Sequence, residues 1–265
     1  MGTQAERVEK FICSFCTLGG SYLGQPFKVL PFQREIIEAV YATDDEGRRI
    51  VRTALVGLPR KNAKSTLAAA LAVYGLIADP SDAAPVVIAA AGDRQQARLV
   101  HDEIKRMILG SPELAAVCEV FRNEIRCTRN GGVARVVSAD AGLQQGANPT
   151  LVIVDEFHIH ANSDLYEALT LASATRNQPL TLVISTAGYE LESPLGKLYR
   201  YGRRVESGEV DDPSFAFIWH GPGDNEEYDA NDPEVWQRFN PAWPHFLNHD
   251  EFHSAHLRTP TAPFV

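Results

Sequence analysis

The sequence predicts an α/β fold built around a mostly parallel sheet. Apolar runs rich in β-branched residues recur along the chain, and segments with helical periodicity separate them. The runs are apolar throughout and do not alternate with polar residues, which is typical of strands covered on both faces. The 265 residues, 45% of them hydrophobic and 22% charged, suffice for one large domain with its own core and exclude a disordered chain.

Four apolar runs predict strands, and four periodic segments predict the helices that follow them. The strands are expected at 50–57, 85–91, 150–155 and 180–186. The helices are expected at 65–77, 94–109, 165–173 and 194–205. In such sheets ligands bind beyond the carboxyl ends of the strands, so we expect the chemistry where each strand ends.

The first strand leads into LPRKNAKST and an alanine-rich helix, which indicates a phosphate-binding loop. In such loops backbone N–H groups hold phosphate, a lysine neutralises it and a hydroxyl binds Mg²⁺. Lys64 and Ser65 would take the last two roles. The match to G-x-x-x-x-G-K-[ST] is incomplete, because Leu58 and Ala63 occupy the two glycine positions and Gly57 stands one place early. An ordinary strand–turn–helix with a solvated lysine is the alternative.

The third strand, LVIVDE, ends in the adjacent carboxylates of Asp155 and Glu156. Buried carboxylates are costly without compensation. With Mg²⁺ present, Asp155 would hold the ion and Glu156 would orient the attacking water; an acidic strand end at the surface is the alternative. The fourth strand ends in Ser185 and Thr186, hydroxyls that would sense a terminal phosphate. Here a glutamate directly follows the Mg²⁺ aspartate, and the strand 86–91 lies between the phosphate loop and the acidic strand. This is the layout of motor-type ATPases rather than of small GTPases.

Together these segments resemble the large terminase subunit of tailed bacteriophages, the ATPase that drives viral DNA into a procapsid. The resemblance is to the branch whose phosphate loop reads P-R-K-N-x-K-S, matched here at 59–65, so that the missing glycines are a trait of that branch. Further similar segments, in order from about residue 31 to the C-terminus, are PFQRE, GDRQQA, LVIVDEFH, RNQPL, STAG, WQRFNPAW and HLRTPTAPF. The resemblance implies a RecA-like P-loop ATPase core of the motor type.

The resemblance also implies roles for individual residues. Gln33 matches the glutamine that recognises adenine. A glutamine amide can both donate to and accept from the edge of the base, which would favour ATP over GTP. Arg60 matches an arginine that can reach the γ-phosphate in related packaging ATPases. The motif that couples hydrolysis to movement is matched by Ser185, Thr186 and Ala187. The expected ATP-binding residues of the loop are Pro59, Arg60, Lys61, Asn62, Ala63, Lys64, Ser65 and Thr66.

Related motors take an arginine finger from a neighbouring subunit, from the loop that precedes the acidic strand. Here that loop reads SADAGLQQGANPT and contains neither arginine nor lysine. A guanidinium suits the dispersed charge of the transition state. Either Arg176, in RNQPL, or Arg60 supplies it, or the finger comes from elsewhere.

The composition changes near residue 210. From 213 to 265 there are eight acids against two bases, with seven of the 16 prolines, all three tryptophans and five of the eight histidines. We therefore expect an ATPase core at 1–210 and a linker subdomain at 211–265. A full large terminase subunit also carries a nuclease domain with a cluster of metal-binding acids. The acids of the tail do not lie on alternating strands, so no nuclease activity is expected of this chain.

The net charge of −9 argues against a generally basic surface, so a DNA contact has to be local and sensitive to salt. One side of the last predicted helix is a candidate for such a contact, or for one with another subunit, with an ordinary solvated basic face as the alternative; its residues are Lys197, Arg200, Arg203 and Arg204. Arg94 and Arg98 are a second candidate.

Two patterns raise the question of a metal site. Cys13-x-x-Cys16 has no second CxxC, and Cys16 falls at helical spacing with Val8 and Ile12, which favours a core position over zinc. Histidines about four apart near the C-terminus are more typical of a solvated helix than of metal ligands; they are His245, His249, His253 and His256. The cysteine count indicates a reducing cytoplasm, and neither a signal peptide nor a membrane span is expected.

The resemblance implies ATP hydrolysis with Mg²⁺, coupled to translocation of double-stranded DNA in the host cytoplasm and transiently at the procapsid portal. Expected partners are the DNA, the portal protein and the small terminase subunit, and the working form is expected to be a homo-oligomeric ring, with a monomer in isolation. Two alternatives are a helicase-type or other DNA-dependent ATPase and a nucleotide-binding assembly protein without turnover. The PRKNAKS loop and the HLRTPTAPF ending disfavour the first, and an intact Glu156 disfavours the second.

Overall fold

The computed structural model describes residues 2–92, 94–138, 148–188, 190–224, 226–229 and 231–258, with only the backbone of Arg94. Its strands are β1 (Thr53–Gly57), β2 (Val86–Ala91), β3 (Cys118–Val120), β4 (Glu124–Cys127), β5 (Val133–Ser138), β6 (Leu151–Asp155), β7 (Leu180–Ser185) and β8 (Phe215–Trp219). In the described residues they form one eight-stranded sheet in the order β3-β4-β5-β2-β6-β7-β1-β8.

The sheet is parallel from β5 to β8 and antiparallel only at its β3–β4–β5 edge. Each of the four predicted strands is present, so the mostly parallel α/β fold is confirmed. The strand that carries the acidic pair, β6, is separated from β1 by β7. Since these three neighbouring strands are parallel, the carboxyl ends of β1, β7 and β6 lie side by side.

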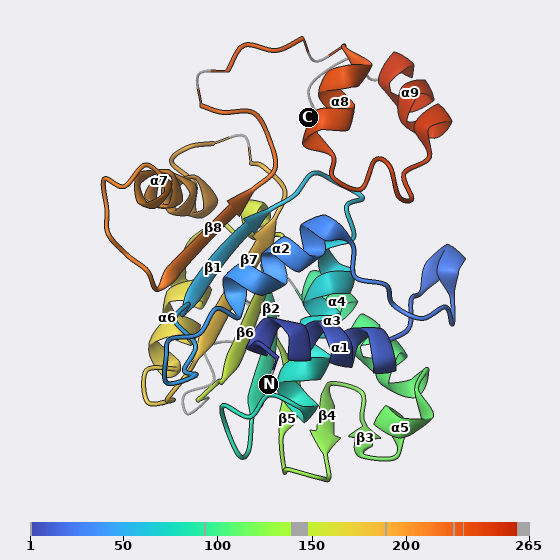
Figure 1. Cartoon of the computed structure of the whole chain (residues 1–265), viewed down its shortest axis with the longest axis vertical. Helices are drawn as coiled ribbons and strands as arrows, with labels where there is room; N and C mark the ends of the chain where they lie inside the picture. The colour runs from blue at the N-terminus through green and yellow to red at the C-terminus, as the bar shows by residue number, and fades with distance from the viewer. Residues whose placement is uncertain are drawn as a thin grey trace.

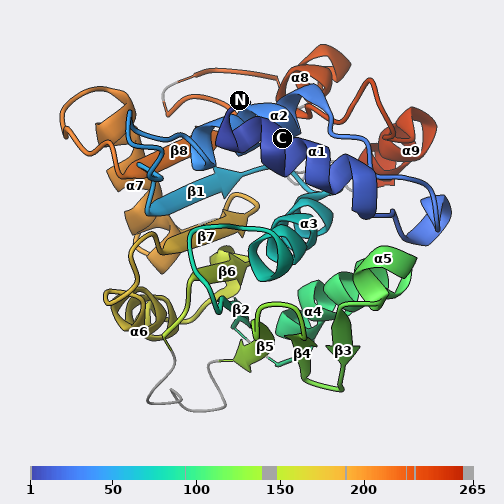
Figure 2. The same cartoon turned by 60° about the horizontal axis from the view of Figure 1, so that its bottom comes forward.

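Helices cover both faces of the sheet, as Figure 2 shows. On one face lie α1 (Gln4–Phe15), α2 (Pro31–Val40), α3 (Lys64–Ile77) and α4 (Arg94–Leu109). On the other lie α6 (Asp164–Ala172) and α7 (Pro194–Glu206). Each helix predicted between strands is found within one or two residues of its expected bounds.

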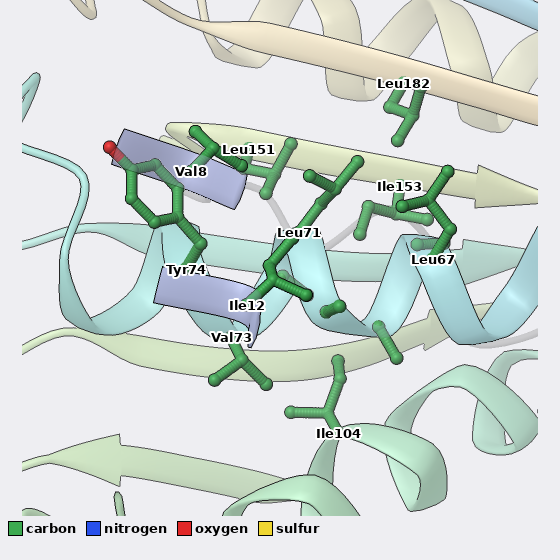
Figure 3. Close-up of a cluster of buried hydrophobic side chains, with 14 of the residues drawn as sticks. Val8, Ile12, Leu67, Leu71, Val73, Tyr74, Ile104, Leu151, Ile153 and Leu182 are labelled. Atoms are coloured by element: carbon green, nitrogen blue, oxygen red, sulfur yellow. The ribbon is translucent and has the colours of Figure 1, made fainter. Parts of the chain in front are cut away.

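The helix α3 is buried over nearly its whole length, because its alanines let neighbouring helices and strands approach from every side. Figure 3 shows Leu67, Leu71 and Tyr74 of α3 packed with Val8 and Ile12 of α1. The Tyr74 hydroxyl accepts a hydrogen bond from Gln4 Nε2 at 2.7 Å. The first turn of α3, which follows the predicted phosphate loop, is thus fixed to the densest part of the core.

Short helices complete the described chain: η1 (Gly20–Tyr22), α5 (Pro112–Ala115), η3 (Phe157–Ile159), α8 (Pro233–Phe239) and α9 (His249–Arg258). Figure 1 shows α8 and α9 at the top of the view, beyond the ends toward which β1 and β8 point. No helix in the described ranges combines the length and the apolar character needed to cross a lipid bilayer.

The strand β8 was not expected. It pairs in parallel with β1 over its full length, from Thr53 opposite Phe215 to Gly57 opposite Trp219. The sheet thus continues past the boundary expected near residue 210. We propose that the linker subdomain begins after Trp219 instead.

Candidate nucleotide-binding site

The predicted phosphate-binding loop between β1 and α3 has a left-handed backbone at two residues that are not glycine. Lys61 and Ala63 have φ values of 65° and 55°, in the left-handed region. This conformation costs a residue other than glycine about 1–2 kcal/mol. Ala63 therefore takes, under strain, the conformation that the second glycine of the pattern provides freely.

The lysine of the loop folds back over it. Lys64 Nζ donates to the carbonyl oxygens of Leu58 at 3.2 Å and Pro59 at 3.1 Å. Burial lowers the pKa of Lys64, and the negative charges of Glu156 and Asp155 oppose that effect. The ammonium group thus lies between the loop and the acidic pair.

The remaining loop residues divide into one buried and several accessible side chains. Asn62 is buried and donates to the carbonyl oxygens of Pro59 and Arg60. The side chains of Arg60 and Lys61 are exposed, and Thr66 in the first turn of α3 is half-buried.

A hydroxyl in the first turn of α3 lies next to a carboxylate at the last residue of β6. Ser65 Oγ donates to Asp155 Oδ2 at 2.9 Å, and the backbone N–H of Glu156 donates to Asp155 Oδ1 at 3.0 Å. Burial raises the pKa of Asp155 to about 6, with a smaller contribution from the charge of Glu156. Burial makes ionisation of this carboxyl unfavourable in the absence of a cation. The carboxylate of Asp155 and the hydroxyl of Ser65 together are suitable oxygen ligands for Mg²⁺.

Glu156 is half-buried and also has a left-handed backbone, with φ at 48°. Its Oε2 lies 3.1 Å from His158 Nδ1. Burial opposes ionisation of this carboxyl, but the contact with His158 and the charges of Lys64 and Arg60 outweigh it and lower the pKa of Glu156. Glu156 is therefore ionised at neutral pH, as a group that orients water must be.

His158 connects the acidic strand to the predicted coupling motif. Its Nδ1 lies 3.2 Å from Ser185 Oγ and 3.2 Å from Thr186 Oγ1, and its backbone N–H donates to Ser185 Oγ at 3.1 Å. No contact of His158 was predicted from the sequence. The signal for one is its position two residues after Glu156, because the neighbouring strand ends in two hydroxyls.

A cavity of about 330 Å³ lies beside the loop, where β1, β7 and β8 end and α7 begins. Arg60, Thr186 and Ala187 line it together with the aromatic rings of Tyr199 and Trp219. Gly57 also lines it, and a Cβ atom there would lie 2.0 Å from the indole of Trp219. Gly57 is thus required by the packing of β8.

Gln33 lies in the first turn of α2, where 2% of its surface is exposed. Its amide oxygen accepts the backbone N–H of Leu30 at 3.0 Å and so caps its own helix. Gln33 does not line the cavity, although the ring of its neighbour Phe32 lies 6.3 Å from that of His220, which does. Adenine recognition by Gln33 stays a prediction.

The structure does not bring Arg176 to the phosphate loop. Its Nη1 lies 2.6 Å from Asp82 Oδ2, and its Nε donates to the carbonyl oxygen of Asn148 at 2.9 Å. These groups precede β7, β2 and β6, so they lie at the amino ends of the strands, opposite the loop. Arg176 therefore does not reach the loop of its own subunit, and its role as the arginine finger in a neighbouring subunit's site stays a prediction. The SADAGLQQGANPT loop lies largely outside the described residues.

Three of the four residues on the predicted basic face of α7 form ion pairs with acidic neighbours. These ion pairs are Arg200–Glu192 at 3.0 Å, Arg203–Glu206 at 2.6 Å, Arg203–Asp224 at 3.4 Å and Arg204–Glu209 at 2.7 Å. Lys197 is exposed. Of the second candidate pair, Arg98 lies 3.5 Å from Asn123 Oδ1, and the side chain of Arg94 lies outside the described residues.

The patterns that suggested metal ligands have other contacts. Cys16 is 2% exposed and belongs to the core, as predicted. The ring of His249 stacks on Trp243 at 4.2 Å, and that of His256 lies 4.6 Å from Trp236. In the part of the chain that the structure describes, no three His, Cys, Asp or Glu side chains are grouped to hold a metal ion.

Comparisons with known proteins point to one family. The chain is 28% identical to the terminase large subunit of Enterobacteria phage HK97 over 192 residues, 69% of this chain and 37% of that protein. The crystal structure of the HK97 large terminase matches with a TM-score of 0.82 and 25% identity, over 98% of this chain and 53% of that one. The large terminase of the thermophilic phage D6E in complex with ADP has the same fold, with a TM-score of 0.55 and 9% identity over 88% of this chain and 51% of that one.

These relatives are longer than this chain, which spans 37% of the curated HK97 protein and 53% of its crystallised chain. The fold of the matched part is the RecA-like fold of terminase ATPase domains. Residues 31–204 match the family described as the terminase large subunit, ATPase domain, and they include the loop, the acidic pair and the coupling motif. The chain belongs to this family, the ATPase domain of the terminase large subunit.

Proposed function

We propose that this chain hydrolyses ATP with Mg²⁺ to move double-stranded DNA into a procapsid. The observation that carries the proposal is the meeting of Ser65, Asp155 and Glu156 beside Lys64, where β1 and β6 end. Burial of Asp155 raises its pKa, so an ionised carboxylate at this position lowers the stability of the fold. A residue with a purely structural role would not require that loss of stability.

Each of these side chains has a task in such a reaction. Lys64 would neutralise the phosphates, and Ser65 and Asp155 would hold Mg²⁺, which neutralises charge developing on the transferred phosphoryl group. Glu156, ionised and fixed by His158, would orient water in line with the γ-phosphate. Arg60 lies beside the cavity and its charge acts on Glu156, which supports Arg60 as a guanidinium for the transition state.

The motion that follows hydrolysis would begin at the coupling motif. Hydroxyls of Ser185 and Thr186 contact His158, which in turn contacts Glu156. A change at the γ-phosphate would therefore reach β7 through two contacts. The family supports DNA, the portal protein and the small terminase subunit as partners, a ring as the working form, and the host cytoplasm and the portal as its location.

The test is steady-state phosphate release by the chain, with and without double-stranded DNA. Glu156→Gln should lower turnover by about 10²- to 10⁴-fold, because a positioned carboxylate is lost, while ATP binding is retained. Glu209→Gln makes the same change in an exposed ion pair between the segment after α7 and Arg204 and should leave turnover without DNA unchanged.

Three outcomes separate the candidate functions. Turnover that DNA stimulates and Glu156→Gln abolishes supports the packaging motor. Strand separation of a DNA duplex would indicate a helicase-type enzyme instead. Binding of ATP without turnover, even with DNA and portal protein present, would refute hydrolysis and leave the nucleotide-binding assembly protein.

A further inference from the structure

Asn62 links the phosphate loop to a distant segment of the chain. Its Nδ2 donates to Asn240 Oδ1 at 3.0 Å, and its Oδ1 accepts the backbone N–H of Ala242 at 2.9 Å. Asn62 and Asn240 are each 1% exposed, and Ala242 is fully buried. The loop is thus hydrogen-bonded, away from solvent, to the segment that follows α8.

The same amide also organises the loop itself. Asn62 Nδ2 lies 3.3 Å from the carbonyl oxygen of Pro59 and 3.1 Å from that of Arg60. The Pro59 carbonyl is in turn one of the two that hold Lys64 Nζ. One side chain therefore joins the backbone on which the predicted phosphate ligands are arranged.

The loop needs such support because it lacks glycine. Asn62 stands between Lys61 and Ala63, the two residues with left-handed backbones. Strained conformations of this kind persist only where the surrounding structure determines them. The support on the other side is firm, since Asn240 Nδ2 donates to the carbonyl oxygen of Trp236 at 2.8 Å and Trp236 is 1% exposed.

We propose that Asn240 is a positioning residue for ATP binding, which acts through Asn62 to hold the glycine-poor loop in its left-handed conformation. The proposal rests on the proposed function of the loop as a nucleotide site. It also assigns the segment after α8 a direct mechanical connection to that site.

The test compares Asn240→Ala with Asn248→Ala, a matched change at an exposed asparagine that caps α9. Affinity is measured with a non-hydrolysable ATP analogue and Mg²⁺. Asn240→Ala should weaken binding by roughly five- to tenfold, the equivalent of one buried hydrogen bond, and Asn248→Ala should not change it. Amide hydrogen exchange at 60–64 should accelerate in Asn240→Ala alone.

A second background distinguishes positioning from general destabilisation. Ala63→Gly relieves one of the two strained residues of the loop and so reduces its need for support, because glycine adopts φ near 55° without strain. In that background Asn240→Ala should weaken binding by clearly less than in the wild-type loop, by about two- to threefold, because Lys61 alone stays strained. An equal loss in both backgrounds would overturn the proposal, as would unchanged affinity and exchange in Asn240→Ala.

Two further results keep the test decisive. If Asn240→Ala fails to fold, Asn240→Ser is the second variant: it buries no charge, its side chain is too short to replace the amide oxygen that Asn62 contacts, and exchange at 60–64 should accelerate; unchanged slow exchange there would count against the proposal. If the wild-type chain binds no nucleotide, the proposed function fails, whereas the exchange comparison still reports on the contact between Asn62 and Asn240.

Discussion

Replacing Asp155 by asparagine should stabilise the fold while it removes the predicted Mg²⁺ ligand. Asp155 is 3% exposed, and burial raises its pKa from 3.8 to about 6. A tenfold change in proton affinity corresponds to about 1.4 kcal/mol, so keeping this carboxylate ionised at pH 7 costs the folded chain roughly 3 kcal/mol. Asparagine carries no charge and can still accept from the Glu156 N–H and bond to Ser65.

The stability that Asp155→Asn adds should increase as the pH rises. Below pH 3.8 the carboxyl is protonated in both states and costs nothing. Between pH 3.8 and about 6 the unfolded chain ionises while the folded chain keeps the proton, so stability falls, and above 6 the loss is complete. The advantage of Asp155→Asn should be roughly 1.5 kcal/mol at pH 5 and roughly 3 kcal/mol at pH 7.5.

Urea unfolding at these two pH values, followed by fluorescence of the tryptophans, measures the difference. Adding Mg²⁺ with a non-hydrolysable ATP analogue should reverse the order of stability, because the ion then compensates the carboxylate of the wild-type chain. A variant that is less stable than wild type at pH 7.5, or whose advantage is the same at pH 5, would refute the reasoning.

The other predictions concern residues near and far from the loop. His158→Ala should lower turnover by roughly ten- to a hundredfold, because Glu156 loses its orienting contact, with affinity for the ATP analogue unchanged; an equal loss of affinity would contradict this. Arg176→Ala should lower the free energy of unfolding in urea by about 1–3 kcal/mol, because Asp82 loses its partner, and leave phosphate release per folded chain unchanged. A selective loss of turnover with Arg176→Ala would instead place that guanidinium in a neighbouring subunit's site.

The parallel strands and the strand–turn–helix that carries Lys64 and Ser65 could be predicted because their signals are local. Continuous apolar runs and a lysine–serine pair before an alanine-rich helix need no knowledge of distant contacts. The strand β8 has the apolar run FAFIW as well, but it lies in the segment whose proline and tryptophan content suggested a separate subdomain. Composition therefore concealed a pairing that the backbone makes with β1.

What could not be predicted at the site depends on long-range placement. Similarity of the RNQPL segment says nothing about which end of the sheet Arg176 occupies, and Asp82 is 94 residues away along the chain. The arginines of α7 lie on one side of their helix, but the pattern does not show that Glu192, Glu206 and Glu209 pair with them. The contact of Asn62 with Asn240 spans 178 residues and has no periodic signal.

The close approach of Gly57 and Trp219 restricts how this protein can diverge. The indole is fixed against Phe217 and Tyr199, with ring centroids 6.0 and 4.7 Å apart, so it cannot swing aside to admit a side chain at 57. A homologue with alanine or a larger residue at 57 must therefore carry a smaller residue at 219 or lack the eighth strand. The two positions should covary across the family, as a record of packing at the sheet edge rather than of phosphate chemistry.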